Sequence, residues 1–309
     1  MAAPLVLGLD FGGTKIAMAV CEPSGERIAR YAINSNAADG ARISFDRGVV
    51  AARALMAESA PGRDLIAVGA STFGIPFDDH VELGPAIPGW EELEFGRELR
   101  EAFPGARVTM TTDVKAAAAA EARWGSLAGC DPAVYLNLGT GLAVAIVVAG
   151  RVVAGAHGAS GEVGYNLRAI ADVGAALDQR TMLEETVSGL ALGRRATRER
   201  GRATTAEEVF MADPADPVAA RLVQEFSDEL AYHLVNLAIL VDPQRIAVGG
   251  GMVRSFERIK PVLDGALRAG VPYPPELVLA EFPYDAPLMG ALALAVESAQ
   301  ELLGEEASV

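Results

Sequence analysis

Two glycine-rich turns constrain the fold of this chain more than any other feature. The first, Asp-Phe-Gly-Gly-Thr, occupies residues 10–14, and the second, Gly-Thr-Gly, occupies residues 139–141. Apolar runs on both sides of each turn predict a β-hairpin. Glycine lets a backbone approach a ligand closely, and successive N–H groups in such a turn can bind an anion. Alone, the first turn would also fit an ordinary tight hairpin. The pair, one opening each half of the chain, predicts two similar domains that face one nucleotide.

The composition bounds the class of protein. With 309 residues, 51% of them hydrophobic, the chain is long enough for about two domains with full cores. A net charge of −15 argues against nucleic-acid and anionic-membrane partners, which attract basic surfaces. The two cysteines, Cys21 and Cys130, lack the spacing of a disulfide framework or a zinc site. Since the chain shows neither a signal peptide nor a long apolar segment, we expect a soluble cytoplasmic protein.

Apolar periodicity and turn residues predict alternating strands and helices along both halves. Strands are expected at 5–9, 16–20, 26–34, 65–70, 107–111, 133–138, 142–148, 151–154, 245–248 and 277–281, and helices at 45–58, 92–103, 116–124, 220–241 and 287–303. Triplets of strands followed by alternating helices and strands indicate an α/β protein with two mixed-sheet domains.

Motifs along nearly the whole chain resemble those of the ROK family (repressor, open reading frame, kinase), a branch of the actin-like ATPase and sugar kinase fold. They are Leu9–Lys15, Pro88–Trp90, Asp113 before an Ala-rich helix with Glu121, Leu138–Gly141, Gly155–Tyr165, Leu183-Glu184 before Ser188-Gly189, Asp242-Pro243 before Gly249–Gly251, and Gly290-Ala291. The resemblance implies a two-domain α/β fold of the actin-like ATPase (ribonuclease H-like) type, with mixed sheets and an interdomain cleft that closes around a sugar. It implies a small domain over 1–112, a larger one over 113–290, and a final helix at about 291–309 that packs back on the first.

The resemblance also implies an activity, the ATP-dependent phosphorylation of a sugar hydroxyl, usually the primary 6-hydroxyl. Asp113 matches the general base, although Asp113 or Thr112 would equally suit the cap of the following helix. The residues expected to bind ATP are Gly12, Gly13, Thr14, Lys15, Gly139, Thr140, Gly141, Ser188, Gly189, Gly250 and Gly251. Asp10 is expected to hold Mg²⁺ through water. The residues expected to line the sugar site are Gly74, Thr112, Asp113, Glu162, Tyr165 and Glu184.

Three of these assignments have simple alternatives. Glu162 would also fit a solvated loop, and Glu185 could take the role of Glu184 after a slip of one residue. A run of three glycines at 249–251 would also fit a plain turn between a strand and a helix.

The chain departs from the family pattern at the sugar site. Segment 170–180 has no Cys or His where many members carry a zinc loop, so we expect no zinc site. Tyr165 stands where the family usually has a His that binds zinc and the sugar, and Thr112 stands where it has Asn. Lys115 also replaces an Asn, and either brings a cation to the pocket or points to solvent. Because a site that hydrogen-bonds each hydroxyl rejects analogues strongly, these changes predict an altered acceptor.

The acceptor expected from these departures is a hexose, an amino sugar such as kanosamine or glucosamine, or a related cyclitol. Alternatives are a catalytically inactive sugar sensor of the same fold and a sugar-responsive transcriptional regulator. The regulator is disfavoured because the first hairpin starts at Leu5, which leaves no room for a preceding DNA-binding domain. The resemblance further implies a homodimer.

Overall fold

A computed structural model describes residues 3–213 and 215–306, which divide into two compact units. Unit 1 contains the described residues of Met1–Arg123, Ala154–Ala159 and Asp285–Val309, and unit 2 those of Trp124–Val153 and Ser160–Tyr284. These compact units are not the domains expected from the sequence. The domain boundaries expected at residues 112 and 290 stay a prediction. Residues 307–309 of the expected final helix lie outside the described residues.

Unit 1 is built on a five-stranded mixed sheet. In spatial order its strands are β3 (Arg27–Asn34), β2 (Lys15–Cys21), β1 (Leu5–Phe11), β4 (Leu65–Thr72) and β7 (Arg107–Thr112). The first three are antiparallel, and β1, β4 and β7 are parallel to one another. A short hairpin, β5 (Ile75–Pro76) and β6 (Val81–Glu82), forms a separate two-stranded sheet.

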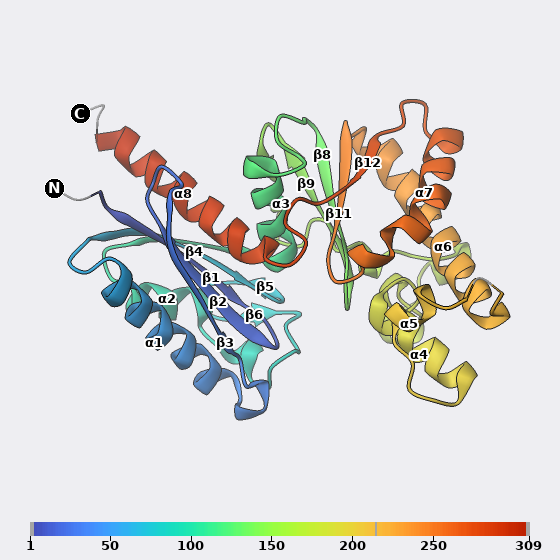
Figure 1. Cartoon of the computed structure of the whole chain (residues 1–309), viewed down its shortest axis with the longest axis horizontal. Helices are drawn as coiled ribbons and strands as arrows, with labels where there is room; N and C mark the ends of the chain where they lie inside the picture. The colour runs from blue at the N-terminus through green and yellow to red at the C-terminus, as the bar shows by residue number, and fades with distance from the viewer. Residues whose placement is uncertain (1–2, 214, 307–309) are drawn as a thin grey trace. The chain divides into compact units, whose positions relative to one another are not determined.

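Helices cover both faces of this sheet (Figure 1). On one face, α1 (Ala41–Ser59) and α2 (Phe95–Ala102) bury an aromatic cluster in which Phe11 stacks on Phe45. On the other face lies α8 (Ala286–Glu306), so close that a Cβ on Gly69 would come within 1.9 Å of the Ala291 carbonyl oxygen. The remaining helix, α3 (Asp113–Trp124), follows β7 directly.

Unit 2 repeats the strand order of unit 1. Its sheet runs β10 (Arg151–Val152), β9 (Leu142–Val148), β8 (Ala133–Leu138), β11 (Arg245–Gly249) and β12 (Glu276–Leu279). β8, β11 and β12 are parallel, and the hairpin strands are antiparallel. The core lies between this sheet and α6 (Pro217–Val241) with α7 (Phe256–Gly270), beside α4 (Gly189–Arg200) and α5 (Ala206–Phe210). The described residues also form the 3₁₀ helices η1 (Ala37–Asp39), η2 (Trp90–Glu92), η3 (Val163–Tyr165), η4 (Ile170–Asp172), η5 (Leu177–Gln179), η6 (Leu183–Glu185) and η7 (Val253–Ser255).

The predicted α/β class with two mixed sheets is confirmed, and each glycine-rich turn does connect the first two strands of its sheet. Within residues 3–213 and 215–306, the structure contains no helix whose length and apolar content would suit a membrane span.

Candidate active site

In unit 1 the predicted site residues gather at the carboxyl end of the parallel strands. Asp10 lies near the end of β1 and pairs in register with Ser71 of β4, while Thr112 ends β7 opposite Thr72. Asp113 follows at the first position of α3. Ligands of α/β sheets bind at this edge, because the loops and helix N-termini that follow the strands meet there.

Asp10 is a buried carboxylate with only 7% of its surface exposed. The Ser71 hydroxyl donates a hydrogen bond to Asp10 Oδ1 at 2.9 Å. Burial raises the pKa of Asp10 from 3.8 to about 7, and the negative charge of Asp113 adds to the rise, while the Ser71 bond and the Lys15 cation oppose it. The two carboxylates, Asp10 and Asp113, are therefore close enough to repel each other.

Asp113 is fixed by its place at the start of α3. The N–H of Val114 donates to Asp113 Oδ1 at 2.8 Å. Burial raises the pKa of this carboxyl above its ordinary value, against the opposing effects of the Val114 bond and of the positive charge of Lys115. A carboxylate with a raised pKa accepts a proton more readily, as a general base must.

The residues beside Asp113 are both buried. Thr112, 5% exposed, accepts a bond from the N–H of Lys115 at 3.3 Å, so its hydroxyl caps the helix. Lys115 is 4% exposed. Of the two placements that the sequence left open for Lys115, an orientation to solvent is therefore wrong.

The first glycine-rich turn is held by its carbonyl oxygens. Gly13 O accepts from the Ser35 hydroxyl at 2.7 Å, Thr14 O accepts from the Ser35 N–H at 3.0 Å, and Lys15 O accepts from Gly12 N–H at 2.9 Å. In the described part of the chain, the N–H groups of Gly13 and Thr14 donate to no protein acceptor, so both suit an incoming anion. The exposed Lys15 side chain lies 3.5 Å from Asp285, beside the same turn.

Gly74 lies in unit 1, in the bend between β4 and β5. Its φ is +78°, and a Cβ there would come within 2.6 Å of the Glu82 carbonyl oxygen. Only glycine fits this backbone without strain. Whether Gly74 contacts a sugar stays a prediction.

In unit 2 the start of α4 and the residues after β11 both meet the second glycine-rich turn. Gly139 O accepts from Gly189 N–H at 2.8 Å, which joins the turn to the start of α4. Ser188 caps that helix by accepting from Ala191 N–H at 3.1 Å. Gly250, with φ +92°, passes so close that a Cβ would come within 2.4 Å of the Leu138 carbonyl oxygen. The structure thus brings together the predicted ATP-binding residues of unit 2: Gly139, Thr140, Gly141, Ser188, Gly189, Gly250 and Gly251.

The predicted sugar-binding residues of unit 2 also lie together. The pKa of the Tyr165 phenol is raised first by burial and then by the negative charges of Glu162 and Glu184, so both carboxylates lie near that ring. Glu184 Oε2 accepts from the N–H of Leu142 at 2.9 Å. Glu185 instead accepts from Met182 N–H at 2.8 Å, within the turn that contains Glu185 itself. Of the two glutamates, Glu184 is the one that reaches the glycine-rich turn.

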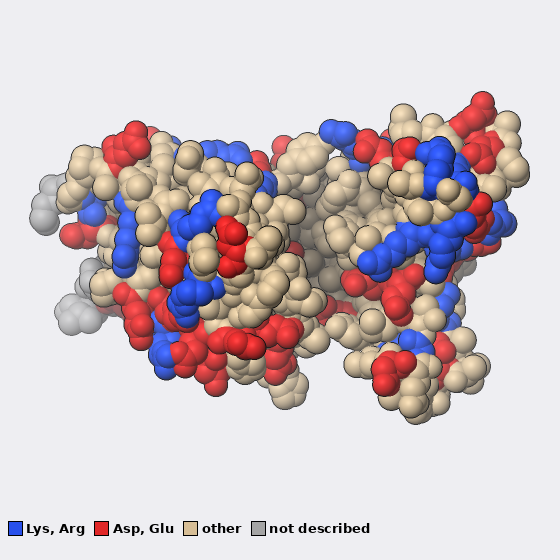
Figure 2. All heavy atoms as spheres, turned by 90° about the horizontal axis from the view of Figure 1, so that it is seen from below, with Lys and Arg blue, Asp and Glu red and all other residues tan. Residues whose placement is uncertain are grey.

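Sequence reasoning missed a cavity of about 540 Å³ along α4 in unit 2. It runs from Gly189, at the second turn, to Arg194 and Arg198 and is closed by the segment Thr204–Ala206. Figure 2 shows Lys and Arg side chains gathered on this side of unit 2. The signal in the sequence is the arginine-rich run that follows Ser188-Gly189.

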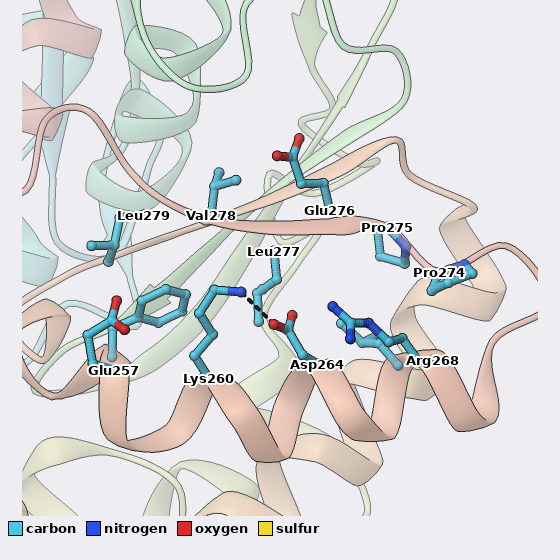
Figure 3. Close-up of a pocket in the computed structure, with 12 residues that line it drawn as sticks. Glu257, Lys260, Asp264, Arg268, Pro274, Pro275, Glu276, Leu277, Val278 and Leu279 are labelled. Atoms are coloured by element: carbon cyan, nitrogen blue, oxygen red, sulfur yellow. Dashed lines mark hydrogen bonds and ion pairs between the residues drawn. The ribbon is translucent and has the colours of Figure 1, made fainter.

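A second cavity, of about 600 Å³, lies between α7 and the edge strand β12 (Figure 3). Lys260 and Asp264 pair across one turn of α7 at 2.5 Å, and Glu276 pairs with Arg245 of β11 at 2.6 Å. None of the predicted site residues lines this cavity.

Among the described residues, no group of three or more His, Cys, Asp or Glu side chains is arranged to hold a metal ion.

Comparisons with known proteins identify relatives of this chain. The model of the ROK family matches residues 6–298. The kanosamine kinase of Amycolatopsis mediterranei is 30% identical over 269 residues, which cover 86% of this chain and 87% of that protein. The chain is similar in structure to a ROK hexokinase from Thermus thermophilus, with a TM-score of 0.82, 29% identity, and coverage of 96% of this chain and 99% of that one.

A second solved structure is a ROK family glucokinase from Streptomyces griseus in complex with glucose and AMPPNP. It matches with a TM-score of 0.72 and 27% identity over 95% of this chain and 99% of that one. The predicted actin-like ATPase fold is confirmed by these likenesses. The chain belongs to the ROK family.

Proposed function

We propose that this chain, an ATP-dependent sugar kinase of the ROK family, phosphorylates a hydroxyl of a hexose, an amino sugar or a related cyclitol, with Asp113 as the general base. The observation that carries the proposal is the position of Asp113. Its carboxylate accepts a hydrogen bond from the N–H of Val114 at the start of α3. This position lies at the edge of the sheet where the predicted site residues of unit 1 gather. The kanosamine kinase among its relatives and the glucokinase with bound glucose and AMPPNP support this class of acceptor and donor.

Asp113 would take the proton of the attacking hydroxyl as the new P–O bond forms. In phosphoryl transfer the protein mainly positions the groups and neutralises charge, and the carboxylate accepts the proton. The N–H groups of Gly13 and Thr14 would bind phosphate oxygens, as would the backbone of Gly139–Gly141.

Asp10 suits the Mg²⁺ ion that such a reaction uses. Its buried carboxylate receives one protein hydrogen bond, from Ser71, and oxygen atoms are the ligands that Mg²⁺ prefers. Mg²⁺ usually keeps several of its water ligands, so Asp10 would hold the ion through a bound water while phosphate oxygens fill other positions. When bound, the ion would neutralise charge on the β- and γ-phosphates.

The cavity along α4 would take the adenosine of ATP. Gly189 joins this cavity to the second turn, and an α-helix rises ~1.5 Å per residue, so Arg198 lies ~14 Å along α4 from Gly189. That length suits a nucleoside whose phosphates lie on the turn. Guanidinium groups stack on planar bases and pair with phosphates.

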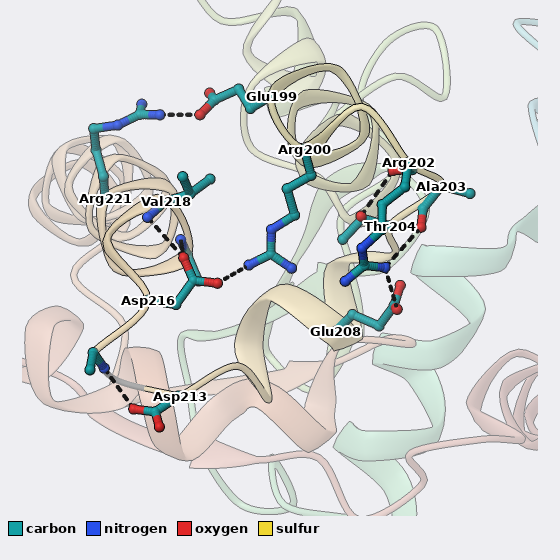
Figure 4. A network of polar contacts seen from close by, with 12 residues as sticks. Glu199, Arg200, Arg202, Ala203, Thr204, Glu208, Asp213, Asp216, Val218 and Arg221 are labelled. Carbon is teal, nitrogen blue, oxygen red and sulfur yellow. Dashed lines mark hydrogen bonds and ion pairs between the residues drawn. The ribbon is translucent and has the colours of Figure 1, made fainter.

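Arg194 and Arg198 differ from the other arginines around them. Arg200, Arg202 and Arg221 each pair with a carboxylate (Figure 4). Within the described residues, Arg194 and Arg198 have no carboxylate within 4.0 Å, although the chain carries a net charge of −15. Their charges are therefore available to a ligand in the cavity.

Replacing Arg194 and Arg198 together with Met should raise the KM for ATP by about tenfold, the equivalent of ~1.4 kcal/mol, and leave the KM for the sugar unchanged. Arg195→Met is the matched control, because Arg195 pairs with Glu225 and does not line the cavity. Glu225 keeps Arg221 as a partner in that control. The KM values are measured by steady-state kinetics with varied ATP. An unchanged KM for ATP in the double variant would show that the nucleoside does not bind in the cavity along α4.

Tyr165 and Thr112 should determine the choice of acceptor. Replacing Tyr165 with His, or Thr112 with Asn, should change the ranking of acceptors in kcat/KM and leave the KM for ATP nearly constant. A gained or lost hydrogen bond to a neutral group is worth about 0.5–1.5 kcal/mol, which corresponds to about twofold to more than tenfold. If neither substitution changes kcat/KM for any acceptor, these two side chains lie outside the sugar site.

An ADP-release screen across glucose, glucosamine, kanosamine, N-acetylmannosamine, fructose and cyclitols tests the proposal, with the product mapped by NMR. Sugar-dependent ADP release and a phosphorylated hydroxyl are expected. Sugar binding without ADP release from any acceptor would favour the inactive sensor. We further propose that the protein is cytoplasmic and forms a homodimer. The exposed apolar side chains of Ile170, Val173 and Leu177 support the homodimer.

A further inference from the structure

Glu184 is packed between the second glycine-rich turn and η3. Its Oε2 accepts from the N–H of Leu142, the first residue of β9, at 2.9 Å. A Cβ on Gly141 would come within 2.4 Å of Oε2, and a Cβ on Gly164 within 3.2 Å of Glu184 Cβ. The side chain therefore occupies a slot between two glycines, one in the turn expected to bind phosphate and one in η3.

The slot joins the two predicted subsites of unit 2. Gly164 belongs to η3 with Tyr165, which follows Glu162 and is expected to contact the sugar. The same segment is fastened to β9, because Gly161 O accepts from Val144 N–H at 2.9 Å. A displacement of the Glu184 carboxylate would thus shift both the turn expected to bind phosphate and the segment expected to bind the sugar.

We propose that Glu184 is a positioning residue that fixes the turn Gly139–Gly141 for the phosphates of ATP and couples this turn to the acceptor segment around Tyr165. This inference rests on the proposed kinase function and adds a role for Glu184 besides contact with the sugar. The hydrogen bond to Leu142 holds the end of the turn, so the phosphate-binding N–H groups are oriented before ATP arrives. A sugar that contacts Glu184 or Tyr165 then stabilises the same arrangement and raises the affinity for the nucleotide.

The test measures binding of Mg²⁺-AMPPNP by calorimetry without sugar, a condition in which a residue that only contacts sugar has no effect. Glu184→Ala should weaken binding by about tenfold, because a charge-assisted bond to the turn is lost. Glu184→Gln should stay within about threefold of the wild type, because the Gln carbonyl oxygen still accepts from Leu142. Glu185→Ala is the matched control and should bind as the wild type does, because the Glu185 carboxylate accepts from Met182 N–H in its own turn and, among the described residues, makes no hydrogen bond to the glycine-rich turn.

A double-mutant cycle with Gly141→Ala supplies a second, independent readout. The new methyl group displaces the Glu184 carboxylate, so Gly141→Ala should weaken AMPPNP binding in the wild type and add little in the Glu184→Ala background. Equal costs in both backgrounds, or full AMPPNP affinity in Glu184→Ala, would overturn the proposal.

Amide hydrogen exchange of Leu142 separates this inference from the kinase function. Faster exchange in Glu184→Ala than in Glu185→Ala is expected even if no nucleotide binds. A wild type that neither binds AMPPNP nor phosphorylates a sugar would refute the proposed function, whereas unchanged exchange at Leu142 would refute the positioning role alone.

Discussion

Replacing Asp113 with Asn should lower the turnover of ATP by about 10²–10⁴-fold, the usual contribution of a general base. Asn has nearly the same size, and its carbonyl oxygen can still accept from the N–H of Val114, so the start of α3 should keep its geometry. The amide has no basic oxygen that could take the hydroxyl proton. The KM for ATP and the affinity for the sugar should therefore change little while kcat falls.

The matched control is Asp178→Asn, which removes an exposed carboxylate of η5. Its kcat should equal that of the wild type. The measurement is coupled ADP release at saturating sugar and ATP. An Asp113→Asn variant that keeps its turnover within about threefold of the wild type would exclude Asp113 as the base.

Replacing Asp10 with Asn should stabilise the magnesium-free protein at pH 8 by up to about 4 kcal/mol, since a pKa shift of one unit corresponds to ~1.4 kcal/mol. Burial raises the pKa of Asp10 from 3.8 to about 7. Between these values the unfolded chain has lost the proton and the folded chain retains it, so the free energy of unfolding of the wild type falls as pH rises. Above about pH 7 this loss is complete, and below about pH 4 it vanishes.

Asn at position 10 is neutral at every pH, and its oxygen can accept from Ser71 as Asp10 does. Urea unfolding from pH 4 to pH 8 in buffer with chelator measures the difference between the two proteins. The expected difference grows with pH, and a pH-independent difference would show that Asp10 titrates normally. Turnover of the variant should fall. A carboxylate that lowers the free energy of unfolding is expected to be retained because the reaction needs it.

The strands of this chain are well predicted by the sequence, and the helix starts less so. Runs such as 133–138 are apolar and bounded by turn residues, and β8 has those bounds. The helix expected at 116–124 begins instead at Asp113, because the Thr112 hydroxyl caps it. The helix expected at 92–103 begins at Phe95, because Trp90–Glu92 forms a separate 3₁₀ turn.

The parts of the candidate site that a glycine pattern marks can be predicted from the sequence. The burial and the hydrogen-bond partners of its other side chains depend on tertiary packing and cannot. Gly12–Thr14 and Gly139–Gly141 stand out in the sequence, because two such turns, each between apolar runs and each opening one half of the chain, are hard to explain as ordinary hairpins. The burial of Lys115 depends on residues packed over α3, and the bond between Glu184 and Leu142 joins segments more than 40 positions apart. Arg194 and Arg198 become distinct only when the structure shows which neighbouring arginines are already paired.

Transfer of an isotopically labelled phosphoryl group is the most direct test of the proposed reaction. The protein is incubated with Mg²⁺, a sugar acceptor and ATP that carries ¹⁸O at the non-bridging γ-oxygens, and the products are analysed by mass spectrometry. We expect a sugar phosphate that carries all the γ-label and whose ester oxygen comes from the unlabelled sugar. Label found only in free inorganic phosphate, with every sugar recovered unmodified, would contradict the assignment of this chain as a sugar kinase.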